Sequence, residues 1–144
     1  MYPSVLVVGQ DDARLADTRA ALAAGGLANP VVGCADAVDA ADFINGRPPF
    51  GDRRESPQPA VVVTDLHLTR GSGLDVLRLL RGHLTSRNTP VVILADGATT
   101  AEIQSAQQLG AAAFLSAAIA PSVLLGVIRD TGVPWSVGRL AAPA

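Results

Sequence analysis

Five short apolar runs, each followed by a segment with helical character, constrain the fold of this chain more than any other feature. The runs are rich in Val, Ile, Leu and Ala and lie at residues 5–8, 30–34, 60–64, 90–94 and 112–115. Continuous apolar runs of this length are typical of strands buried on both faces of a parallel sheet. Helices are predicted between and after them, at 11 or 12 to 24, 35–45, 74–84, 100–109 and 121 to about 131. The alternation predicts an α/β fold, a doubly wound parallel sheet with helices on both faces.

The length of 144 residues suits one domain with a single core. We expect that domain to span residues 1–132. Residues 46–59, rich in Pro, Gly and charge, predict a long loop within it. The apolar tail at 133–144 is expected to pack on the domain or on a dimer partner. The single cysteine, Cys34, excludes an intrachain disulfide and is expected to be a small buried residue.

Composition excludes several classes of function. Charged residues make up 17% of the chain, the net charge is −2, and no basic stripe is present, so we expect no nucleic-acid partner. No signal peptide or membrane span is predicted, which favours a cytoplasmic protein. All eleven basic residues are Arg, which excludes any mechanism that needs a Lys ammonium group. Glycine-rich phosphate loops and the Gly-x-Ser-x-Gly elbow are absent, and we predict no enzymatic activity.

Ligands of doubly wound folds bind beyond the carboxyl ends of the strands, so the residues that follow each apolar run are the candidate site. These positions are residues 9–11, Asp65, residues 95–96 and residues 116–117. Asp65 follows a buried run, in the sequence VVVTDL at residues 61–66.

The segment around Asp65, with Leu68 and Gly73, and the sequence LGAAAFL at residues 109–115 resemble receiver domains of two-component response regulators. The loop at 46–59 and the tail with Trp135 resemble, more specifically, the stand-alone receivers that partner bacterial phytochromes. The resemblance covers essentially the whole chain. It implies a flavodoxin-like (βα)5 fold with strand order 2-1-3-4-5. It also implies signal transduction in a two-component phosphorelay.

Carried over residue by residue, the resemblance makes Asp65 the phosphoacceptor and Phe114 the aromatic switch residue. The other parts of the family's phosphoryl site are replaced. Gly9 and Gln10 stand where an acidic pair would hold Mg²⁺, Ala95 stands where a hydroxyl is expected, and Ala117 stands where a Lys is expected. The family's prolines are replaced too, by Thr69 and Ala118. The resemblance therefore implies a degenerate site, because the lost groups would bind the metal or the phosphoryl oxygens.

No cofactor is expected, although weak Mg²⁺ binding by Asp65 stays open if a bulge turns Asp11 inward. We favour the alternative that Asp11 or Asp12 caps the first helix. Asp96 is expected to cap the following helix or to close a turn with Gly97. His67 superficially resembles the cobalamin-binding motif Asp-x-His-x-x-Gly, but Arg70 stands at the glycine position, so we interpret His67 as a loop residue.

Three functional hypotheses follow. The first is a pseudo-receiver that signals by contact with a protein: a downstream signalling protein, a sensor histidine kinase or a second copy of the chain. The second is a residual phosphoacceptor modified on Asp65. The third is a small-molecule sensor, because small residues at the strand ends (Gly9, Ala95 and Ala117) would leave a less charged pocket.

Overall fold

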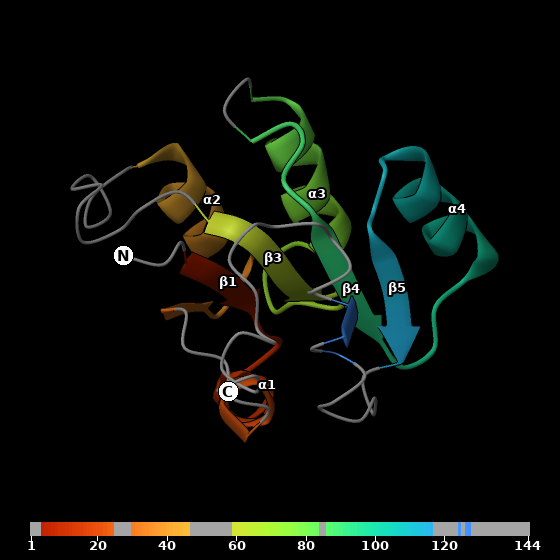
Figure 1. Ribbon diagram of the computed structural model, residues 1–144. Helices are drawn as coiled ribbons and strands as arrows, with labels where there is room; N and C mark the ends of the chain where they lie inside the picture. Colours follow the sequence, from red (N-terminus) through yellow and green to blue (C-terminus); the bar gives the residue numbers. More distant parts are fainter. Residues whose placement is uncertain are drawn as a thin grey trace, which may run out of the picture.

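The chain forms a five-stranded parallel sheet wrapped by helices (Figure 1). The computed structural model describes residues 4–24, 30–46, 59–83, 86–116, 124 and 126–127. Its strands are β1 (Ser4–Val8), β2 (Val31–Cys34), β3 (Pro59–Asp65), β4 (Val91–Ala95) and β5 (Ala113–Ser116). Its helices are α1 (Asp12–Ala24), α2 (Ala37–Asn45), α3 (Gly73–Arg81) and α4 (Thr100–Gln108). The strands pair in parallel in the order β2-β1-β3-β4-β5, which confirms the predicted fold class and strand order.

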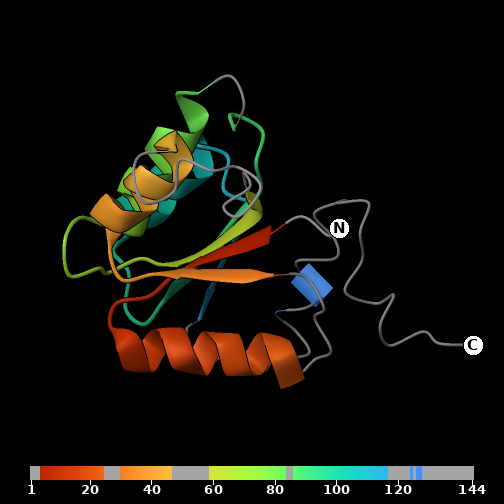
Figure 2. The ribbon, with the colours of Figure 1, turned by 90° about the vertical axis from the view of Figure 1, so that its left-hand side faces the viewer.

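Both faces of the sheet are covered. This explains why residues 5–8 of β1 are all apolar. Successive side chains of a strand point to opposite faces. Leu6 and Val8 therefore join the core beneath α2, α3 and α4, whereas Val5 and Val7 join a second core on the α1 side. Of the four helices described, Figure 2 shows α1 below the sheet and α2, α3 and α4 above it. Leu124, from a short helical piece, also packs into the α1-side core.

Helix α3 begins one residue earlier and ends three residues earlier than the prediction of 74–84. Ser72 starts the helix through a capping box: its side chain accepts the backbone N–H of Asp75, and the Asp75 carboxylate accepts the N–H of Ser72. At the other end, the N–H of Gly82 donates back to carbonyls of the last turn. Hydrogen bonds at the two ends, rather than apolar periodicity, thus set the helix length.

Helix α4 is capped by Thr99 and not by Asp96, which corrects one of the two roles expected for that aspartate. Thr99 and Glu102 form a second capping box, with each side chain accepting the other's backbone N–H. Those hydrogen bonds from Thr99 lower the pKa of Glu102. Asp96 lies instead in the turn after β4, beside Gly97 with its positive φ of 74°.

Arg81, the last residue of α3, holds together the segments on either side of β4. Its guanidinium donates to the backbone carbonyls of Thr89 and Leu109 at 2.8 Å each and of Gly110 at 2.9 Å. Burial lowers the pKa of this guanidinium. The side chain therefore satisfies three loop carbonyls that the sheet does not use.

Several predictions concern residues outside the described ranges. They include most of the loop at 46–59, the tail at 133–144, Ala117, and all of the predicted last helix except 124, 126 and 127. The domain bounds drawn from the sequence therefore stay predictions. Among the described residues, no helix has the length and apolar character needed to cross a membrane.

Candidate functional site

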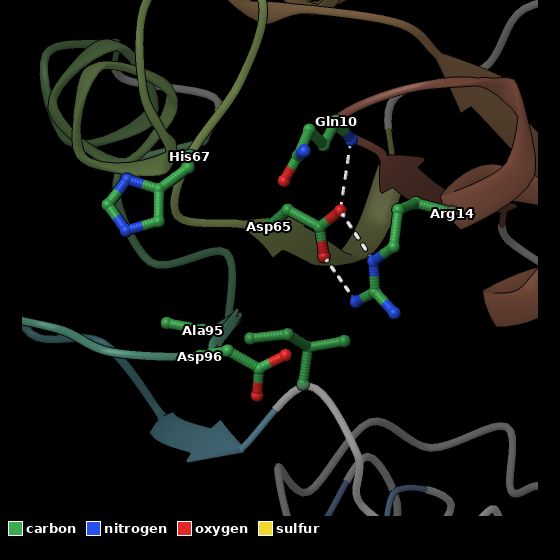
Figure 3. A pocket seen from close by; sticks show the side chains of 7 residues that line it. Gln10, Arg14, Asp65, His67, Ala95 and Asp96 are labelled. Carbon is green, nitrogen blue, oxygen red and sulfur yellow. Dashed lines mark hydrogen bonds and ion pairs between the residues drawn. The ribbon is translucent and has the colours of Figure 1, made fainter.

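The carboxyl ends of β1, β3 and β4 meet at one edge of the sheet, where doubly wound folds bind their ligands. The strand register places Val8 beside Thr64, and Asp65 beside Leu94. A cavity of about 260 Å³ lies at this edge (Figure 3). It is lined by Gln10, Arg14, Asp65, His67, Leu94, Ala95 and Asp96.

Asp65 is the last residue of β3, and both oxygens of its carboxylate are engaged. Arg14, in the first turn of α1, donates from Nη2 to Oδ1 at 2.9 Å and from Nε to Oδ2 at 3.3 Å. The backbone N–H of Gln10 also donates to Oδ2, at 2.9 Å. The Asp65 side chain is 7% exposed and that of Arg14 is 27% exposed, so most of the pair is removed from water. Figure 3 shows the guanidinium facing the carboxylate as a two-pronged fork.

The hydrogen bond to Asp65 raises the pKa of Arg14; burial opposes that rise, and the charges of Asp65, Asp96 and Asp17 add to it. The guanidinium of an Arg does not lose its proton in proteins, and this shift favours the charged form further. The positive charge of Arg14 therefore lies in direct contact with the carboxylate of Asp65, the acceptor candidate.

The loop between β1 and α1 is tied to the loop after β3. The Thr69 hydroxyl donates to the Gln10 carbonyl at 2.8 Å, while the Gln10 N–H binds Asp65. At Gly9, a Cβ would lie 2.7 Å from Leu15 Cγ and 2.9 Å from the Leu15 backbone nitrogen. Helix α1 thus approaches the end of β1 so closely that a side chain at residue 9 needs a shift of the helix.

Asp11 makes the contact expected of a capping residue. Its Oδ1 accepts the backbone N–H of Arg14 at 2.8 Å, and its carbonyl accepts the N–H of Leu15 at 3.0 Å. Asp11 is not among the residues that line the cavity. Its carboxylate instead fixes the turn of helix from which the Arg14 side chain extends.

The opposite wall of the cavity is formed by the loops after β3 and β4. His67 is an exposed loop residue, and its Nε2 lies 3.3 Å from the carbonyl oxygen of Gly97. Asp96 adds a second carboxylate beside Ala95. Within the described ranges, no group of three or more His, Cys, Asp or Glu side chains could hold a metal ion.

Comparison with known proteins places these features in a family. No protein-family model matches the chain. The bacteriophytochrome response regulators RtBRR and AtBRR are similar to it in structure, with TM-scores of 0.82 and 0.80 and identities of 30% and 31%. Each alignment covers 94% of this chain, together with 81% of RtBRR and 96% of AtBRR.

The chain belongs to the response-regulator receiver family. The sensory/regulatory protein RpfC of Xanthomonas campestris pv. campestris is also 36% identical to this receiver over 103 residues, which are 70% of the receiver. The receiver matches only 14% of the length of RpfC. Receiver domains are in general non-enzymatic signalling modules that interact with proteins such as histidine kinases, so signal transduction is the broad function of this chain.

The receiver brings together three of the site residues predicted from its sequence. Gln10, Asp65 and Ala95 all line the cavity, whereas Gly9 lies behind it against α1. Phe114, the expected switch residue, lies in β5 and packs half-buried against the core beneath α2, α3 and α4. Ala117 falls outside the described residues.

Sequence reasoning missed Arg14, the residue with the most direct contact to Asp65. One signal could have found it. The chain lacks Lys, so any cationic side chain that pairs with Asp65 has to be an Arg or a His, and Arg14 lies in the first turn of the helix that follows the first strand. Helical periodicity could not show that this side chain reaches across to β3.

Proposed function

We propose that this receiver is a pseudo-receiver that signals by protein–protein contact without a normal phosphorylation cycle. The observation that supports this most strongly is the state of the Asp65 carboxylate. Both of its oxygens accept hydrogen bonds from within the chain, from Arg14 and from the Gln10 N–H. A carboxylate has to present a free oxygen to attack a phosphoryl group.

The neighbouring donors support the same proposal. Phosphoryl transfer depends on positive charge and preorganised donors around the transferred group. Gln10 and Ala95 supply no carboxylate or hydroxyl, no Lys is present in the chain, and Asp96 adds negative charge to the cavity. A divalent cation, which the family resemblance implies, does not fit this donor set, because Mg²⁺ prefers carboxylate ligands and Arg14 engages the Asp65 carboxylate.

For the output surface we propose α4 and β5, together with the helix that the sequence predicts from residue 121 to about 131. Phe114 and Ile103 are half-buried there, on β5 and α4. In a switching receiver a phosphoryl group shifts the equilibrium of such a surface; here the permanent Arg14–Asp65 pair would set it instead. The partner is a downstream signalling protein, a histidine kinase or a second copy of the chain.

The test is a two-dimensional amide NMR spectrum, titrated with Mg²⁺ and then with beryllofluoride, whose adduct with a carboxylate stands in for the phosphoryl group. We expect no shifts that depend on Asp65, and we expect Asp65→Asn to bind the physiological partner as the native chain does. Shifts that begin at Asp65, reach Phe114 and disappear in Asp65→Asn would contradict the proposal.

A residual phosphoacceptor is the second candidate, and one observation favours it: Arg14 is itself a cation at the acceptor, so part of the charge neutralisation is already present. Incubation with acetyl phosphate followed by intact mass measurement separates the two functions. An added phosphoryl mass on the native chain that is absent from Asp65→Asn would establish the second.

The cavity gives less support to the small-molecule hypothesis. Its volume of about 260 Å³ lies below the range of roughly 300–1,000 Å³ usual for ligand pockets. Arg14, Asp65 and Asp96 also make it more charged than the small residues at the strand ends suggest. An unexplained bound mass in a native mass spectrum would revive this hypothesis.

A further inference from the structure

Arg14 differs from the other paired arginines of the described residues in how far it is buried. The Arg70 and Arg78 side chains, which pair with Asp36 and Asp75, are 57% and 54% exposed. The Arg14 side chain is 27% exposed, and its partner is 7% exposed. The Asp36 carboxylate is itself 9% exposed, so what separates Arg14 from Arg70 is the burial of the guanidinium. An exposed guanidinium is screened by water and salt, whereas a partly buried, two-pronged one holds a fixed geometry.

The backbone that carries Arg14 is fixed as well. Asp11 accepts the N–H of Arg14, and the close approach of Leu15 to Gly9 holds the first turn of α1 against the end of β1. The guanidinium therefore reaches Asp65 from a rigid base. Its charge balances one of the two carboxylates on the cavity wall, Asp65 and Asp96.

We infer that Arg14 is the resident cation of this site: its guanidinium takes the place of the divalent cation that other receivers use, and neutralises Asp65 without any diffusible ion. The inference rests on the proposed function and deepens it, since it names what sets the state of the acceptor. It has two consequences. The guanidinium repels divalent cations from the cavity, and the state of the site does not depend on the Mg²⁺ concentration.

The experiment measures Mn²⁺ binding by the paramagnetic broadening of amide resonances of the full chain. Mn²⁺ serves as a probe because, like Mg²⁺, it takes oxygen ligands. The native chain is compared with Arg14→Gln, which removes the charge and keeps a polar side chain. Arg19→Gln is the matched control: Arg19 lies on the same helix but donates to the Val31 carbonyl, away from Asp65.

A second pair of variants restores a carboxylate at the cavity. Gln10→Asp and the double variant Gln10→Asp, Arg14→Gln present the same two carboxylates at the ends of β1 and β3, and they differ only at residue 14. We expect the double variant to bind Mn²⁺ at least roughly tenfold more tightly than Gln10→Asp alone, with broadening centred on residues 10 and 65. Arg14→Lys keeps the positive charge and is expected to exclude Mn²⁺ as the native chain does.

The inference is overturned if the native chain binds Mn²⁺ at Asp65 as tightly as Arg14→Gln does, or if the two Gln10→Asp variants bind it equally. Equal gains from Arg14→Gln and Arg19→Gln would also overturn it, because a general charge effect would then explain the result. If Arg14→Gln loses its dispersed spectrum, the native chain by itself still tests the exclusion of the ion, because Mn²⁺ broadening centred on Asp65 would overturn the inference. Failure of the proposed function is a different result, a beryllofluoride or acetyl phosphate adduct on the native chain.

Discussion

Replacing Arg14 by Met should destabilise the domain by leaving the Asp65 carboxylate buried without its cation. Met keeps much of the aliphatic stem of Arg, so the change removes the charge and two hydrogen bonds with little loss of packing. The expected effect is therefore electrostatic. The size of the loss in the free energy of unfolding depends on how far the Arg14 and Asp65 side chains are exposed to water.

Removing one partner of a fully buried ion pair typically costs about 3–5 kcal/mol. Here the Arg14 side chain is 27% exposed, and the Gln10 N–H still binds Asp65 after the change. We therefore expect a loss of about 2 kcal/mol in the free energy of unfolding, at the lower end of values for a carboxylate that loses a charged donor. For a domain of this size that corresponds to a fall of about 6 °C in Tm.

Urea unfolding of four proteins tests the origin of this loss: the native chain, Arg14→Met, Asp65→Asn, and the double variant. If the pair is responsible, the double variant should be no less stable than Arg14→Met, because Asn carries no charge that needs a partner. The coupling energy would then be at least about 1 kcal/mol. Losses that add to within about 0.5 kcal/mol would refute the reasoning, because additivity means that the two side chains do not interact.

Three further predictions concern other parts of the structure. Arg81→Met should cost about 2 kcal/mol in urea unfolding, since three loop carbonyls lose their donor, while Arg78→Met on the same helix should change stability by less than about 0.5 kcal/mol. Gly9→Ala should cost about 1–3 kcal/mol because its Cβ meets the first turn of α1. Gly82→Ala should stay within about 0.5 kcal/mol, because its Cβ would lie 3.5 Å from the Arg78 carbonyl oxygen, an ordinary contact distance; equal effects of the two changes on Tm would contradict this. Burial, helped by nearby carboxylates, raises the pKa of the buried Cys34 thiol to about 12. A thiol reagent at pH 8 should therefore modify Cys34 only as fast as the domain opens, whereas rapid labelling of the folded protein would show that the thiol is accessible.

Much of the fold could be predicted because the signals are local. The apolar residues 5–8 of β1 and 61–63 of β3 are all buried, so burial on both faces can be read from consecutive residues. Asp65 could be identified as a site residue for a related reason: it ends a buried strand, and strand ends of a parallel sheet form the ligand edge. The ends of α3 could not be placed, since they depend on hydrogen bonds of Ser72 and Gly82.

The partner of Asp65 could not be predicted, because Arg14 lies 51 residues away in the sequence. A side chain on a helix faces a particular strand only after the helix has packed, and here the contact of Gly9 with Leu15 settles how α1 lies against β1. The amino-acid pattern, together with the family resemblance that it carries, was thus sufficient to predict the strand order and to place Asp65 at the ligand edge of the sheet. The packing of α1 against the sheet placed the Arg14 guanidinium on the Asp65 carboxylate, because that contact exists only between elements brought together by the folded chain.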